Sequence, residues 1–149
     1  METYRIVVIL HVLGATVWTG GHLVLALTVL PRAMRAKDPA RVREFESGYE
    51  RIGIPSLLLQ VVTGLWLAMR WIPEGVSWFP PGSPQVHLVL GKLVLLLVTL
   101  ALGIHARTRI IPRLDAARLP SLRNHIVAIT VTSVLFLVLG VAIRTGVSF

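Results

Sequence analysis

Residues 10–22 read Leu10-His11-Val12-Leu13-Gly14-Ala15-Thr16-Val17-Trp18-Thr19-Gly20-Gly21-His22. This stretch lies inside a run, residues 6–30, that contains no Lys, Arg, Asp or Glu. An apolar run of this length predicts a transmembrane helix. His11 and His22 are unusual inside it, because a polar group in hydrocarbon is costly unless it has a partner. The face that carries them is therefore the candidate functional surface.

The spacing of these two histidines places them on the same helical face. The step from one to the other advances the helix by about three turns and a rise of about 16 Å. Gly14, Trp18 and Gly21 fall on or near that face. Small residues let a neighbouring helix or a flat ligand approach closely, so we expect room beside both imidazoles.

The composition predicts a membrane protein with one domain. The chain has 149 residues, of which 54% are hydrophobic, and no cysteine. Its net charge of +8 would suggest nucleic acid binding in a soluble protein. Here the basic residues lie in short loops between apolar runs, which indicates membrane topology and contact with the lipid bilayer instead. We expect no nucleic acid partner, no disulfide and no thiolate metal site.

Four apolar runs predict an all-α membrane protein, a four-transmembrane-helix up-down bundle. The expected spans are about residues 6–30, 52–69, 86–106 and 126–143. Pro31 is expected to end the first helix, and a short amphipathic helix is expected to lead into the second span.

The distribution of Lys and Arg predicts the orientation of the bundle. Six of them lie between the first two spans and five between the last two, whereas only Arg5, Arg70 and Arg144 belong to the opposite side. The positive-inside rule then puts both basic loops in the cytoplasm and both termini outside. We expect a multi-pass protein of a prokaryotic cytoplasmic (inner) membrane.

The five histidines fall into two layers by depth. His11 and His87 belong to the outer layer, and His22, His105 and His125 to the inner one. Which of His105 and His125 would pair with His22 stays open. At the span ends, His87 and His125 also fit ordinary solvated interfacial histidines.

Lys92 is expected near the height of His11, facing the bundle. It could serve as a ligand, a base or an anion partner, or it could instead extend its ammonium to the interface.

Imidazoles in such layers could hold haem iron, bind copper or relay protons. Near the inner layer, Arg32, Arg107 and Arg109 would suit haem propionates. A zinc hydrolase is poorly supported, because the spans contain no acidic residue that could act as a ligand or base. The scarcity of sulfur in the spans also counts against a Cu(I) pathway.

The two halves of the chain resemble each other weakly. The first and third helices each carry a histidine near the inner end and then an apolar-Pro-Arg step, Leu30-Pro31-Arg32 and Ile111-Pro112-Arg113. A duplicated hairpin would produce this pattern.

Several short motifs resemble the copper resistance protein D (CopD) domain family over nearly the whole chain. They are Leu10-His11 with Trp18-Thr19-Gly20-Gly21, then Thr63-Gly64-Leu65, Gly91-Lys92-Leu93, and the basic segment 107–113. The length, the four spans, His11 and Lys92 also resemble HemJ-type protoporphyrinogen oxidases. That resemblance implies a b-type haem with His11 and Lys92 in important positions. His22 and His105 are additional histidines that we do not expect from either family.

The residues therefore favour a protein that binds one or two b-type haems through histidine. It would act in electron transfer or as a haem-dependent membrane oxidoreductase, with quinone or another electron carrier as partner. The alternative is CopD-like copper binding or transport across the membrane. A homo-oligomer fits either function.

Overall fold

The computed structural model describes residues 1–72 and 74–145. The first long segment is α1 (Glu2–Val24), which continues through a π-helical turn, η1 (Leu25–Val29), into α2 (Leu30–Ala36). The second is the single helix α3 (Ala40–Trp71). The third is α4 (Pro84–His105), extended by the π-helical turn η2 (Ala106–Ile110) and the 3₁₀ turn η3 (Ile111–Arg113). The fourth begins with the 3₁₀ turn η4 (Ala116–Arg118) and continues as α5 (Leu119–Thr145).

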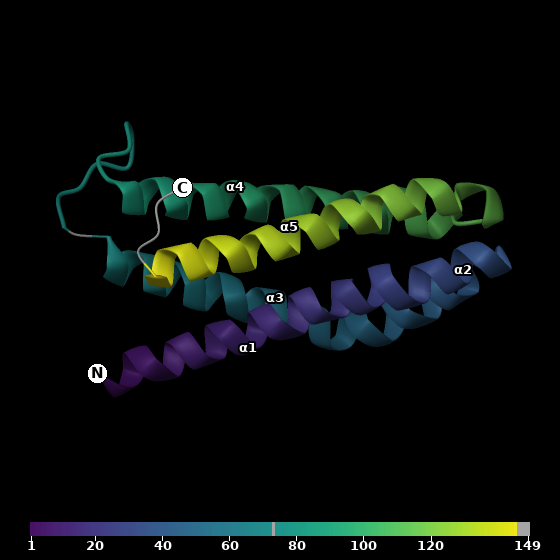
Figure 1. Cartoon of the computed structure of the whole chain (residues 1–149), viewed down its shortest axis with the longest axis horizontal. Coiled ribbons are helices and arrows are strands. Elements are labelled where there is room, and N and C mark those ends of the chain that lie inside the picture. The colour runs from purple at the N-terminus through teal and green to yellow at the C-terminus, as the bar shows by residue number, and fades with distance from the viewer. Residues whose placement is uncertain (73, 146–149) are drawn as a thin grey trace.

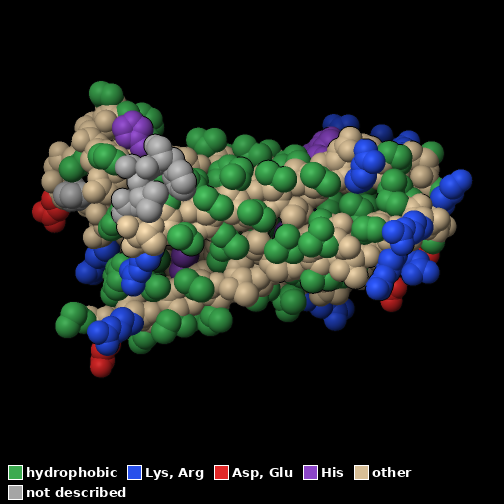
Figure 2. Space-filling view, viewed as in Figure 1, with side chains coloured by type: hydrophobic (Ala, Val, Ile, Leu, Met, Phe, Trp, Pro, Cys, Tyr) green, Lys and Arg blue, Asp and Glu red, His purple; other side chains and the backbone are tan. Residues whose placement is uncertain are grey.

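The all-α fold with four membrane-length helices is confirmed. All four long segments are long and apolar enough to cross a bilayer, and each expected span lies within one of them. Figure 2 shows hydrophobic side chains over the middle of the visible face and Lys and Arg gathered toward its ends. This pattern is that of a multi-pass membrane protein in contact with the lipid bilayer.

Pro31 does not end the first helix, contrary to expectation. A proline inside a helix lacks the amide hydrogen and its ring crowds the carbonyl four residues earlier. The π-helical turn η1 is wider than an α-helical turn and directly precedes this position, so the helix continues to Ala36. The turn η2 stands in the same relation to Pro112. The likeness of the two halves therefore extends from the sequence to the backbone.

The four segments form two hairpins, as Figure 1 shows. One consists of α1 against α3, and the other of α4 against α5; the hairpins meet mainly along α1 and α5. The start of α1, the end of α5 and the connection from α3 to α4 lie at one end of the bundle (Figure 1). The two basic connections lie at the other end.

The larger apolar core lies at the basic end rather than in the middle of the spans. It is built from residues of η1, α2, α3, η2, α5 and the connection between η3 and η4: Leu25, Leu30, Ala33, Val42, Ile110, Leu114, Leu119, Leu122 and Ile126. The buried side chains deeper in the spans include several polar ones: Thr19, His22, Thr63, Thr99, Thr132 and Ser133. Buried polar groups inside a membrane bundle are the first place to look for function.

Candidate functional site

His11 lies in the seam between α1 and α3, with one ring nitrogen already hydrogen-bonded. Its Nδ1 is 2.9 Å from the Thr63 hydroxyl, and that hydroxyl donates to the Leu59 carbonyl at 2.6 Å. A hydroxyl has only one hydrogen, so Thr63 must accept from the Nδ1–H of His11. Nε2 of His11 therefore carries the lone pair, as in a neutral histidine ready to bind a metal.

His22 is held in the same tautomer, but in an aromatic enclosure. It is 7% exposed, and its Nδ1–H donates to the Trp18 carbonyl at 2.8 Å. The Trp18 ring lies 4.4 Å away and the Tyr49 ring 5.6 Å away, centroid to centroid. Nε2 of His22 is again the nitrogen with the lone pair.

The space that we expected beside Gly14 and Gly21 is filled by α3, so that expectation is wrong. A Cβ on Gly14 would lie 2.9 Å from the Ser56 carbonyl oxygen, and a Cβ on Gly21 would overlap the Tyr49 ring. Small residues let two helices approach until side chains of one fill the notches of the other. These glycines therefore serve close helix packing and leave no room for a flat ligand between α1 and α3.

Tyr49 and Thr63 hold this seam together, and sequence reasoning did not assign either of them to the histidines. The Tyr49 hydroxyl lies 2.9 Å from the Trp18 carbonyl and 3.2 Å from the Val17 carbonyl, where it can donate a hydrogen bond. In the sequence, Thr63 shares helical spacing with Ser56 and Gln60, which indicates a polar stripe on one face of α3. That spacing was the available signal, but it does not identify which residue of α1 stands opposite.

The inner layer of three histidines is divided in the structure. His105 of α4 and His125 of α5 pair with each other, with ring centroids 5.0 Å apart and planes 45° apart. The Nε2–H of His125 donates to the Leu102 carbonyl at 2.9 Å, which leaves the lone pair on Nδ1. Within residues 1–72 and 74–145 no group of three metal-ligating side chains forms, so His22 does not join this pair.

The two histidines of the expected outer layer, His11 and His87, also have different surroundings. His87 is exposed, and its Nδ1–H donates to the Ser83 carbonyl at 2.9 Å in the first turn of α4. Lys92 points toward α5, with Nζ 3.4 Å from where a Cβ on Gly140 would stand. The sequence-based placement of Lys92 on the bundle side agrees with this geometry, and its nearness to His11 stays a prediction.

The three arginines expected to surround the inner layer are all exposed. Arg107 forms an ion pair with Glu50, which ties η2 to the first part of α3. Its guanidinium therefore already has a carboxylate partner, whereas no ion pair in the described part of the chain includes Arg32 or Arg109. A ligand with acidic groups at this end would have to compete with Glu50 for Arg107.

Comparison with known proteins identifies the family. A family model described as copper resistance protein D matches residues 43–143, which is more than half of the chain. No curated protein and no solved structure gives a match. The matched region contains Lys92, His87 and the His105–His125 pair, and it begins after α1, which carries His11 and His22. The chain is thus a multi-pass membrane protein that belongs to the copper resistance protein D family.

Proposed function

We propose that this protein binds copper at the membrane and that His105 and His125 supply the protein ligands. The observation that carries the proposal is the 5.0 Å separation of their ring centroids. A metal bound about 2.0 Å from an imidazole nitrogen lies about 3.2 Å from that ring centroid. Two such rings at a near-tetrahedral angle have centroids about 5 Å apart. In the proposed site His105 and His125, the latter through Nδ1, turn their lone pairs to one ion at this separation.

The donor set favours Cu(II) over Cu(I). Imidazole binds copper well, whereas a Cu(I) pathway favours thiolate and thioether ligands, and the chain has no cysteine. His105 is exposed on the outside of the bundle, so the protein leaves room there for a further ligand to the ion. The pair lies toward the basic end, which our orientation assigns to the cytoplasmic side of a prokaryotic inner membrane, with both termini outside. Copper here is cargo or a bound ion at the membrane surface.

Titration of the purified protein in detergent with Cu(II) tests this proposal. We expect one Cu(II) per chain, with nitrogen hyperfine structure in its electron paramagnetic resonance spectrum. Removal of either ligand, by His105→Ala or His125→Ala, should weaken binding at least about tenfold. His87→Ala is the matched control, because His87 is exposed and hydrogen-bonded only within its own helix turn. Stoichiometric binding unchanged in both variants would reject the pair as the site.

The second candidate is a b-type haem held through α1. It is supported by the lone pair on Nε2 of both His11 and His22, since a hydrogen bond from Nδ1 orients a histidine for axial ligation. Because the seam between α1 and α3 is filled, the side of His11 toward Lys92 is the place to look. Bound haem would supply one-electron chemistry, with quinone or another electron carrier as partner.

An absorption spectrum of the purified protein distinguishes the two candidates. A Soret band that disappears in His11→Ala or His22→Ala, with His105→Ala unaffected, would establish the haem function over the copper one. If two haems bind, each single variant should lose a different one, because the two histidines rise about 16 Å apart along the helix.

A further inference from the structure

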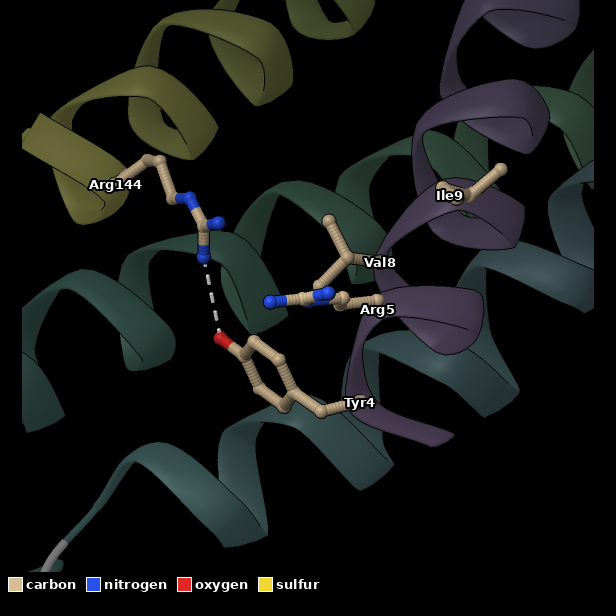
Figure 3. Close-up of a pocket in the computed structure, with 5 residues that line it drawn as sticks. All are labelled: Tyr4, Arg5, Val8, Ile9 and Arg144. Atoms are coloured by element: carbon tan, nitrogen blue, oxygen red, sulfur yellow. Dashed lines mark hydrogen bonds between the residues drawn. The ribbon is translucent and has the colours of Figure 1, made fainter. Parts of the chain in front are cut away.

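A pocket at the end of the bundle where α1 begins and α5 ends lies outside both candidate sites. It is lined by Tyr4, Arg5, Val8 and Ile9 of α1 and by Arg144 of α5 (Figure 3). Nη1 of Arg144 donates to the Tyr4 hydroxyl at 3.3 Å. Figure 3 shows Arg5 extended into the same space, beside Val8. The pocket thus combines two guanidinium groups and a hydroxyl with an apolar wall.

The positive charge of this pocket is not balanced by a carboxylate within the described residues. The ion pairs found there all lie near the basic end, and none includes Arg5 or Arg144. Two like charges that share a pocket at the edge of a low-dielectric region repel each other. An anion between the two guanidinium groups would turn that repulsion into attraction.

The surroundings indicate which anion fits. Guanidinium groups bind phosphate through two parallel hydrogen bonds, and lipid headgroups supply phosphates at the surface of a bilayer. The pocket lies at a helix end, where headgroups meet the bundle, and Ile9 beside it is 58% exposed toward the apolar surface. We infer that it binds the phosphate of an anionic phospholipid, with the acyl chains along the apolar side formed by Val8 and Ile9.

Such a lipid would link the two hairpins. Arg5 and Tyr4 belong to the α1–α3 hairpin, and Arg144 belongs to the α4–α5 hairpin. The hairpins meet mainly along α1 and α5. A phosphate held by both arginines adds a charge-assisted contact at the open end of that interface, far from the apolar core at the basic end.

Lipid binding is tested on the full chain in a mild detergent, with phosphatidylglycerol, phosphatidylcholine and inorganic phosphate as probes. We expect native mass spectrometry to show one retained phosphatidylglycerol and thermal unfolding to shift upward with that lipid. Arg5→Gln and Arg144→Gln should each weaken retention by about tenfold, as expected for loss of a charge-assisted contact. Arg5→Lys and Arg144→Lys keep the charge without the two-pronged geometry and should retain the lipid to an intermediate degree.

Arg70→Gln is the matched control. Arg70 lies at the same end of the bundle, but its guanidinium stacks on Trp66, 4.9 Å from the ring, outside the pocket lining. Equal retention in Arg5→Gln, Arg144→Gln and Arg70→Gln would overturn the inference. If inorganic phosphate or phosphatidylcholine stabilised the protein as much as phosphatidylglycerol, an anionic lipid would be excluded as the specific ligand. Neither result depends on whether copper or haem binds elsewhere.

Discussion

The two hairpins use glycine differently, although their sequences look related. In the α1–α3 seam, Gly14, Gly21 and Gly53 stand where a Cβ would collide with the opposite helix or with the Tyr49 ring. In the second hairpin, the nearest atom to a Cβ on Gly91 is 3.6 Å away, and a Cβ on Gly103 would meet nothing within 4 Å. The first hairpin is therefore a tightly fitted seam around two histidines, and the second is a looser one with its histidines at its two ends.

In the first hairpin, the histidines are therefore part of the helix packing as well as candidate ligands. His11 bonds through Nδ1 across the seam to Thr63, whereas Nδ1 of His22 bonds to the Trp18 carbonyl within α1; in both, Nε2 carries the lone pair. His105 and His125 lie at the end of their hairpin, and only His125 makes a hydrogen bond to the neighbouring helix. The difference in packing between the two hairpins can be tested by substitution.

The largest effect is expected from Gly21→Ala. The added methyl group would overlap the Tyr49 ring, and overpacking of this kind costs about 1–3 kcal/mol. Gly20→Ala is the matched control, because a Cβ there would meet nothing within 4 Å. Unfolding in mixed detergent–SDS micelles should show strong destabilisation for the first variant and none for the second. Equal stability of the two variants would contradict the tight seam.

A smaller loss is expected from Thr63→Val. Removing the hydroxyl leaves the Nδ1–H of His11 without its acceptor, which costs about 1 kcal/mol. Thr63→Ser keeps the acceptor and should stay close to the original stability. The same micelle unfolding assay measures both, and nitrogen NMR of labelled histidine should show the His11 tautomer change only in Thr63→Val. A tautomer unchanged in the valine variant would contradict the assignment.

The opposite sign is expected for Thr99→Val in the second hairpin. The Thr99 hydroxyl is buried and has no hydrogen-bond partner in the described part of the chain. Replacing it with a methyl group removes an unsatisfied polar atom at nearly constant volume, so the protein should gain up to about 1 kcal/mol. A loss as large as that of Thr63→Val would show that the Thr99 hydroxyl has a partner, such as a bound ligand.

The smallest effect is expected from Gly103→Ala. A methyl group there has open space, and alanine has the higher helix propensity, so stability should rise by about 0.5 kcal/mol, the lower end of the usual glycine-to-alanine gain. Copper titration should be unchanged, because the substitution leaves His105 and His125 in place. A marked loss of stability would indicate that this face packs against another helix or a second copy of the chain.

Much of the architecture could be predicted from the sequence. Four apolar runs predict four membrane helices, because a bilayer accepts only segments whose backbone groups bond internally. The helical period correctly put His11 and His22 on one face, and the cost of an unpaired ammonium in hydrocarbon correctly put Lys92 toward the bundle. The prediction about Pro31 was wrong, because a proline rule alone does not include a wider π-helical turn.

The candidate site could be predicted only in part. The sequence predicts how deep each histidine lies along its span, and on this basis His22 was grouped with His105 and His125. It does not predict how the helices are rotated relative to one another, which decides whether residues of equal depth meet. The structure separates them: His22 faces the Tyr49 side of the bundle, and the other two meet across α4 and α5. Helical spacing indicates a polar stripe that includes Thr63, but it does not identify Thr63 and Tyr49 as the partners that orient His11 and enclose His22.

The class of protein, the number of membrane helices and the residues that could carry chemistry follow from composition and from periods along one chain, so they could be predicted without the structure. Which of these residues meet depends on how the helices pack. The rotation and separation of two packed helices depend on side chains of both, as the filling of the Gly21 notch by Tyr49 shows. Partner choice, the tautomers of His11 and His22 and the pairing of His105 with His125 are therefore properties of the packed bundle.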